Sequence, residues 1–146
     1  MAYSNILIAV DGSKCSMSAV EKGVELARDL SANVILLSVV DMTSMVDNAA
    51  VGAIIDKDME TVFEDEADKL LDVLMKKYPY EKTRKIAEEG IAKEAINSIA
   101  EEEKADMIVM GTHGRTGLMH LFMGSVAEYV VRHSKIPVMV VTSAEE

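Results

Sequence analysis

Short apolar runs recur along the chain, and each is bounded by turn-forming or charged residues. Their length and their content of branched side chains are typical of strands buried on both faces of a parallel sheet. Four of the runs are continuous, and a fifth, at 83–87, is weaker. The pattern therefore predicts five strands, at 6–10, 34–40, 83–87, 106–110 and 136–141.

Between the predicted strands, apolar residues recur every three or four positions, as on one face of a helix. Helices are expected from about 16 to 30, from about 56 to 78, from about 92 to 100 and onward from about 125. Pro79 ends the second helix, and Pro137 marks the start or an edge of the last strand because proline cannot donate to a ladder. The stretch 42–54 has no clear period and is interpreted as a connection.

Strands that alternate with helices predict a parallel sheet, because parallel strands need long, right-handed crossovers. The chain has 146 residues and no internal repeat or linker, so we expect one domain over 1–146. Its fold class is α/β: a doubly wound, Rossmann-like, five-stranded parallel sheet with helices on both faces. Such sheets commonly have the strand order 3-2-1-4-5 and bind ligands at the carboxyl ends of the central strands, where the winding reverses.

A glycine-rich segment separates the fourth predicted strand from the last helix, with glycines at 111, 114, 117 and 124 and the helix beginning at Ser125. The first N–H groups of a helix have no partner within it and favour an anion such as phosphate. Gly111 and Gly114 can adopt backbone angles closed to other residues and admit a ligand close to the main chain. The alternative is an ordinary turn with Ser125 as the N-cap.

Asp11-Gly12-Ser13 ends the first predicted strand as a turn-and-cap cluster. If the first and fourth strands are neighbours, Asp11 lies beside Gly111. A nucleotide needs this combination: a carboxylate that accepts hydrogen bonds from ribose hydroxyls, next to main-chain donors for the phosphates. Asp11 could instead serve only as a turn or capping residue.

Composition limits the partners. Lys and Arg number 15 against 25 Asp and Glu, and the resulting formal charge of −10 repels nucleic acid and anionic membranes. A single cysteine, Cys15, excludes an internal disulfide. The chain shows no signal peptide and no apolar run long enough to span a bilayer, so we expect a cytoplasmic protein.

Together these segments resemble the universal stress protein family, and specifically its ATP-binding branch. The resemblance covers nearly the whole chain, apart from the connection at 42–54. It rests on the residues 6–13, 36–41, Gly90, 106–111, the loop spacing G-x2-G-x9-G-S, and 136–138. The loop spacing combined with an Asp-bearing first strand is far more specific than either feature alone.

The resemblance implies a role for each matched position. Asp11 would accept hydrogen bonds from the ribose, and Ala9, Val39 and Met110 would border the adenine or the sugar. Ala9 departs from the family, where a larger residue or proline is common. The phosphates would be held by main-chain N–H groups of Gly111, Gly114, Gly124, Ser125 and Val126. A homodimer would form through the last strand, Val138 to Val141.

Catalytic groups are scarce around this predicted site. Arg115 could reach phosphate oxygens and His113 could hydrogen-bond them. The chain has neither a G-x4-G-K-[ST] loop nor a G-x-G-x-x-G motif after a strand. Any Mg²⁺ would be held mainly by the phosphates and water. We therefore expect an ATP-binding regulatory switch that acts on an unknown protein partner, with slow hydrolysis at most.

Two other functions are compatible with this fold. A dimeric interaction protein that binds no nucleotide would lack the full glycine pattern, which is present here. A phosphotransfer receiver would need an acidic cluster after the first strand and a lysine after a late one, and neither is present in the expected place.

Overall fold

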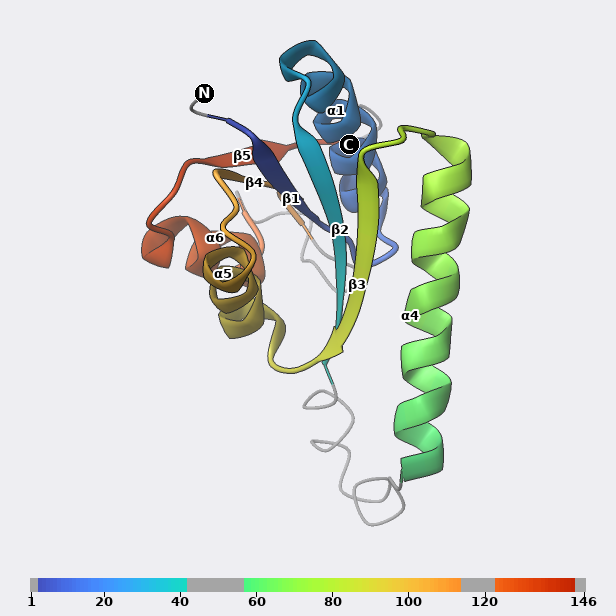
Figure 1. The fold of residues 1–146 in the computed structure, drawn as a ribbon. Coiled ribbons are helices and arrows are strands. Elements are labelled where there is room, and N and C mark those ends of the chain that lie inside the picture. The colour runs from blue at the N-terminus through green and yellow to red at the C-terminus, as the bar shows by residue number, and fades with distance from the viewer. Residues whose placement is uncertain (1–2, 42–56, 114–122, 144–146) are drawn as a thin grey trace.

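The computed structural model describes residues 3–41, 57–113 and 123–143. Within these residues, five parallel strands form one sheet in the order β3-β2-β1-β4-β5 (Figure 1). The predicted fold class and strand order are therefore confirmed. The strands are β1 (Asn5–Ala9), β2 (Asn33–Val40), β3 (Thr83–Glu89), β4 (Met107–Gly111) and β5 (Val138–Val141). The helices in the same residues are α1 (Lys14–Leu30), α4 (Lys57–Lys77), α5 (Ala92–Glu102) and α6 (Ser125–His133). The connection predicted at 42–54 lies outside the described residues.

The central strand β1 is paired on both sides. Its Ile8 lies opposite Leu36 of β2 and Val109 of β4. Strand β2 extends beyond β1, because Ala9 pairs with Leu37 whereas β2 continues to Val40 beside β3. The sheet edge next to the end of β1 is therefore stepped.

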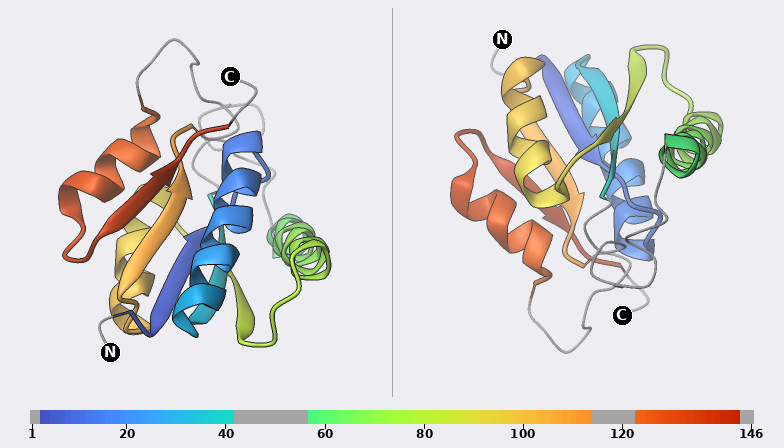
Figure 2. Two further views of the ribbon diagram at one scale, coloured as in Figure 1. Left: turned by 90° about the horizontal axis from the view of Figure 1, so that it is seen from above. Right: turned by 90° about the horizontal axis from the view of Figure 1, so that it is seen from below.

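Helices cover both faces of the sheet (Figure 2): α1 and α4 lie on one side, α5 and α6 on the other. Alternate β1 residues supply the two cores: Ile6 and Ile8 pack on the α1 side, and Leu7 packs on the α5 side. All three are fully buried. Burying such a side chain stabilises the fold by about 1.5–3 kcal/mol, so the sheet is a rigid platform for its end loops.

Two helix starts differ from the sequence expectation. Helix α1 begins at Lys14 rather than at about 16, because the Ser13 hydroxyl accepts a hydrogen bond from Ser16 N at 3.1 Å and caps the helix. Helix α6 has Gly124 as its N-cap, so the alternative in which Ser125 is the N-cap is wrong. Pro137 does precede the last strand, as predicted, and its carbonyl accepts from Ile108 N.

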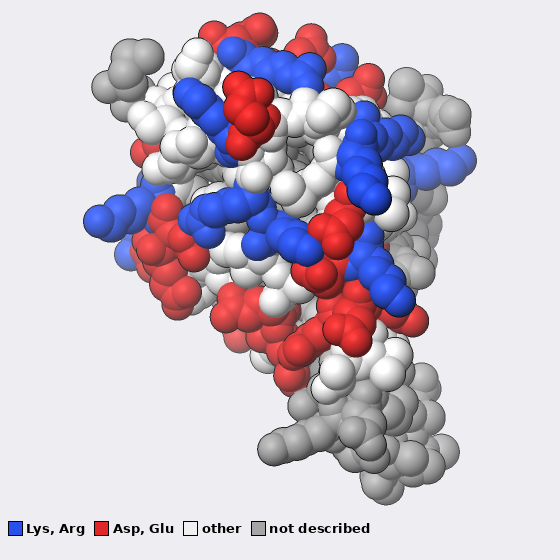
Figure 3. Space-filling model, turned by 45° about the vertical axis from the view of Figure 1, so that its right-hand side comes forward, with Lys and Arg blue, Asp and Glu red and all other residues white. Residues whose placement is uncertain are grey.

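The edge strand β3 carries charged side chains that pair with neighbouring helices. Lys85 Nζ lies 2.7 Å from Asp72 Oδ1 and 2.9 Å from Asp68 Oδ2 of α4. Arg84 pairs with Glu103. Figure 3 shows acidic and basic side chains interleaved over this face of the molecule. Charges on an edge strand disfavour pairing with another sheet.

No helix in the described part of the chain is both long enough and apolar enough to cross a membrane.

Candidate functional site

The carboxyl ends of β1 and β4 lie side by side, as the predicted nucleotide site requires. The two strands pair through Ile8 and Val109, so the turn after β1 adjoins the segment after β4. The Ser13 hydroxyl donates to the carbonyl of His113 at 3.3 Å and joins the two segments directly. The sequence expectation that Asp11 and Gly111 end neighbouring strands is confirmed.

Asp11 is exposed and organises the turn in which it stands. Its Oδ1 accepts from Ser13 N at 2.9 Å, and its own N–H donates to Ser16 Oγ at 3.3 Å. Gly12, with φ 84°, has the left-handed conformation that favours glycine. Asp11 therefore stabilises the turn, which is the alternative that the sequence left open. These hydrogen bonds also hold its carboxylate near the end of β1.

Gly111 is a glycine because α1 passes very close to β4. A Cβ at this position would lie 2.6 Å from Cys15 Cβ and 2.7 Å from the Cys15 carbonyl carbon. Its φ is not positive, since Gly12 is the glycine with positive φ among the described residues. The expectation that Gly111 adopts backbone angles closed to other residues is therefore wrong, and helix packing explains the glycine.

A hydrogen bond joins the two ends of the connection between β4 and α6. Gly124 N donates to the Thr112 carbonyl at 2.7 Å. The buried Thr112 hydroxyl lies 3.1 Å from His113 Nδ1 and 3.7 Å from Cys15 Sγ. Gly114 and Arg115, both predicted to contact phosphate, lie outside the described residues.

The amino end of α6 has no side-chain cap. The first hydrogen bond along the helix runs from Glu128 N to Gly124 O, so the N–H groups of residues 125–127 have no partner within the helix. The N–H of Gly124 itself is used by Thr112, which corrects the expectation that it donates to phosphate. Gly124 has φ −68° and ψ 160°, a conformation open to any residue, so its backbone angles do not require a glycine.

The residues predicted to border the base gather on the α5 and α6 side of the sheet, together with Val126, which was predicted to bind phosphate through its main-chain N–H. Ala9 and Met110 are buried there, and Val39 and Val126 pack partly buried against the same core. Val39 lies on the part of β2 that extends beyond the end of β1. The structure thus brings four separate segments to one end of the sheet.

Three residues that hold this end together were not predicted as site residues. They are Ser13, which links the two turns, Thr112, which closes the β4–α6 connection, and Asp41, whose Oδ2 accepts from Ala92 N at 3.0 Å and caps α5. Ser13 and Asp41 were visible as polar residues ending apolar runs. Thr112 gave no comparable signal, because its contacts with Gly124 and Cys15 join residues far apart in the sequence. Over the described ranges, no group of three or more His, Cys, Asp or Glu side chains could hold a metal ion.

Comparison with known proteins gives consistent matches. The sequence pattern of the universal stress protein family matches residues 2–142. A universal stress protein of Methanocaldococcus jannaschii is 36% identical over 153 aligned residues, which cover 95% of this chain and 82% of that protein. The solved structure of a second protein of that organism is 30% identical, with a TM-score of 0.82 over 97% of both chains.

A third match is a universal stress protein crystallised in complex with cAMP. It is 25% identical to this chain, with a TM-score of 0.67, and the match covers 99% of this chain and 100% of that one. The sequence pattern, the curated relative and the strand order agree. The chain belongs to the universal stress protein family.

Proposed function

We propose that this chain binds an adenine nucleotide, ATP, in the crevice at the carboxyl ends of β1 and β4, and that it works as a regulatory switch. One observation carries the proposal: the uncapped amino end of α6, beginning at the bare Gly124, is tied through Thr112 and His113 to the turn that holds Asp11. A helix amino end attracts phosphate, and a nearby carboxylate suits ribose. The cAMP complex of a family member supports an adenine ligand.

Each part of the nucleotide has a proposed set of contacts. The Asp11 carboxylate accepts from the ribose, and Ala9, Val39 and Met110 border the base. The main-chain N–H groups of Ser125 and Val126 bind phosphate, with the Ser125 hydroxyl beside them. Gly111 provides the close approach of α1 to β4. Gly114 and Arg115 complete the phosphate contacts in this proposal, and the phosphates themselves hold any Mg²⁺.

A switch fits these groups better than an enzyme does. Binding that stabilises ground and transition states equally does not speed a reaction, and the described residues around the crevice supply donors for binding. We propose at most slow hydrolysis and a change in the segments at 42–54 and 114–122 when nucleotide binds. A protein partner then distinguishes the two states. A chain with a single thiol suits the reducing cytoplasm, where we place this function.

We also propose a homodimer through the edge strand β5. Its free edge can pair with a second copy, and Met139 on this strand is 37% exposed. The competing function is a dimer of the same fold that binds no nucleotide. Adenine absorbance released from the denatured, purified protein favours the nucleotide switch over that alternative.

The test is calorimetry with ATP and with adenosine. Asp11→Ala removes a hydrogen bond to a charged group worth about 1.5–3 kcal/mol, so ATP should bind roughly 10- to 150-fold more weakly. Gly124→Val adds bulk where the phosphates would lie, and should weaken ATP strongly while leaving adenosine binding nearly unchanged. Asp11→Asn is the matched control because it keeps the oxygen that accepts from Ser13 N. Equal ATP affinity in wild type and Gly124→Val would refute the phosphate assignment.

A further inference from the structure

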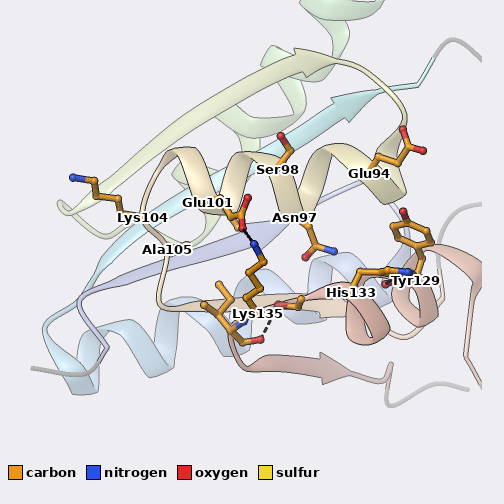
Figure 4. Close-up of a pocket in the computed structure, with 12 residues that line it drawn as sticks. Glu94, Asn97, Ser98, Glu101, Lys104, Ala105, Tyr129, His133 and Lys135 are labelled. Carbon is orange, nitrogen blue, oxygen red and sulfur yellow. Dashed lines mark hydrogen bonds and ion pairs between the residues drawn. The ribbon is translucent and has the colours of Figure 1, made fainter.

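A groove of about 510 Å³ runs between α5 and α6, away from the proposed nucleotide crevice (Figure 4). Its walls include the segments that precede β4 and β5, namely 104–105 and 134–136. These segments lie at the amino ends of the parallel strands, whereas the crevice lies at their carboxyl ends. The groove has the size typical of small-molecule sites in proteins.

Asn97 of α5 is the unusual residue in this groove. Both polar atoms of its side chain are buried, and neither has a hydrogen-bond partner among the described residues. Figure 4 shows the Asn97 amide pointing from α5 toward α6. Buried polar groups are nearly always hydrogen-bonded, because a buried group without a partner has lost its hydrogen bonds to water and gained none in return. An amide left unpaired on both sides therefore needs an explanation.

Several polar side chains around Asn97 already have partners. Lys135 Nζ lies 2.8 Å from Glu101 Oε1. His133 Nδ1 lies 2.9 Å from the Tyr129 carbonyl, and the Ser134 hydroxyl donates to the Ile136 carbonyl at 2.7 Å. Among the described residues that line the groove, Asn97 is thus the one whose side-chain polar atoms are both buried and unpaired.

A carboxamide presents a donor and an acceptor side by side in one plane, so its best complement is another donor–acceptor edge. Two aromatic side chains also line the groove, Tyr129 and His133, whose rings stack on each other with centroids 4.0 Å apart. Two acidic side chains, Glu94 and Glu101, and two basic ones, Lys104 and Lys135, line the groove, so their charges cancel and do not favour a charged ligand. We propose that the α5–α6 groove binds a small, neutral, planar molecule through a carboxamide or lactam edge paired with Asn97.

In this proposal the ligand enters the groove on the side that carries His133 and Tyr129. His133 is exposed, Tyr129 is half-buried, and exposed side chains change rotamer within nanoseconds. The Asn97 amide is thus buried in the protein without ligand, and side chains that can move line the same groove. This site would function whether or not the chain binds ATP.

The test uses benzamide as the probe and acetophenone as its matched control, which keeps the ring and the acceptor but lacks the donor. In ¹⁵N and ¹³C NMR titrations of the full chain, benzamide should shift the Asn97 side-chain NH₂ and the rings of Tyr129 and His133 saturably. Acetophenone should bind at least ten-fold more weakly. Absence of a saturable benzamide shift, or equal binding of the two probes, overturns the proposal and leaves Asn97 satisfied by water alone.

A variant provides the second arm. Asn97→Leu replaces the amide with an apolar group of similar size, so it should abolish benzamide binding while raising Tm by about 2–4 °C. Glu102→Gln, at an exposed position of α5 that does not line the groove, is the control and should keep benzamide binding. Benzamide binding that survives Asn97→Leu contradicts the assignment. The ATP affinity of Asn97→Leu should equal that of wild type, which separates this proposal from the nucleotide site.

Discussion

Replacing Gly111 with alanine tests the close approach of α1 to the end of β4. The added Cβ would lie 2.6 Å from Cys15 Cβ, 2.7 Å from the Cys15 carbonyl carbon and 2.9 Å from Ser16 N. Carbon atoms in contact are normally about 3.5–4.0 Å apart. Two of the three atoms belong to the backbone of the first turn of α1, so no side-chain rotation can relieve the overlap, and the helix itself must move.

Overpacking of this kind typically costs about 1–3 kcal/mol, and a backbone obstacle favours the upper end of that range. A loss of about 3 kcal/mol would lower Tm by roughly 6–12 °C for a chain of this size. It would leave the protein folded at room temperature, because domains are stable by about 5–15 kcal/mol. The variant can therefore be purified and compared with wild type.

Urea unfolding followed by far-UV circular dichroism measures the effect. Gly90→Ala is the matched control, because its Cβ would have Ala95 Cβ at 3.4 Å and Val39 Cγ1 at 4.0 Å, which are ordinary contacts. The midpoint of Gly111→Ala should fall well below that of Gly90→Ala. Equal midpoints for the two variants would show that α1 does not pack against Gly111, and that the glycine has another purpose.

Three further changes test the polar contacts of the fold. Ser13→Ala removes the α1 cap and the link to the β4 end, and should cost about 0.5–2 kcal/mol in urea unfolding; an unchanged midpoint refutes the cap. Asp41→Ala should cost a similar amount, because its carboxylate caps α5 through Ala92 N, while Asp41→Asn should recover much of the loss. Asp72 and Asp68 raise the pKa of Lys85, so its contribution to stability is full below the unfolded pKa and is lost as the pH rises through the folded pKa. Between about pH 9 and 12 the wild-type urea midpoint should therefore fall more than that of Lys85→Gln, and parallel curves would contradict the pairing.

Much of the fold could be predicted from the sequence because its signals are local. The continuous apolar runs of β1, β2 and β4 can only be buried between two helix layers, and the rules for parallel crossovers then restrict the strand order. Strand β3 was predicted only as far as 87, yet it continues to Glu89. Its last residues are charged, and pairing with the longer β2 extends the strand.

The location of the site could be predicted from the sequence, but the structural reason for each of its residues could not. Asp11 and Gly111 were expected to end neighbouring strands, and they do. Position 111 is a glycine because it lies against Cys15, nearly a hundred positions earlier in the chain. No local sequence pattern reveals that contact. Gly124 was expected to donate to phosphate, but its N–H bonds to Thr112. Only the folded chain shows which main-chain donors are already used.

The nucleotide crevice is tested most directly by titrating ¹⁵N-labelled protein with ATP and following the backbone amides. Saturable shifts should appear at residues 11–13, 111–113 and 125–127, while the amides of α4 and of the α5–α6 groove stay in place. Shifts confined to other parts of the sheet, or no saturable shift at millimolar ATP, would contradict nucleotide binding at the ends of β1 and β4.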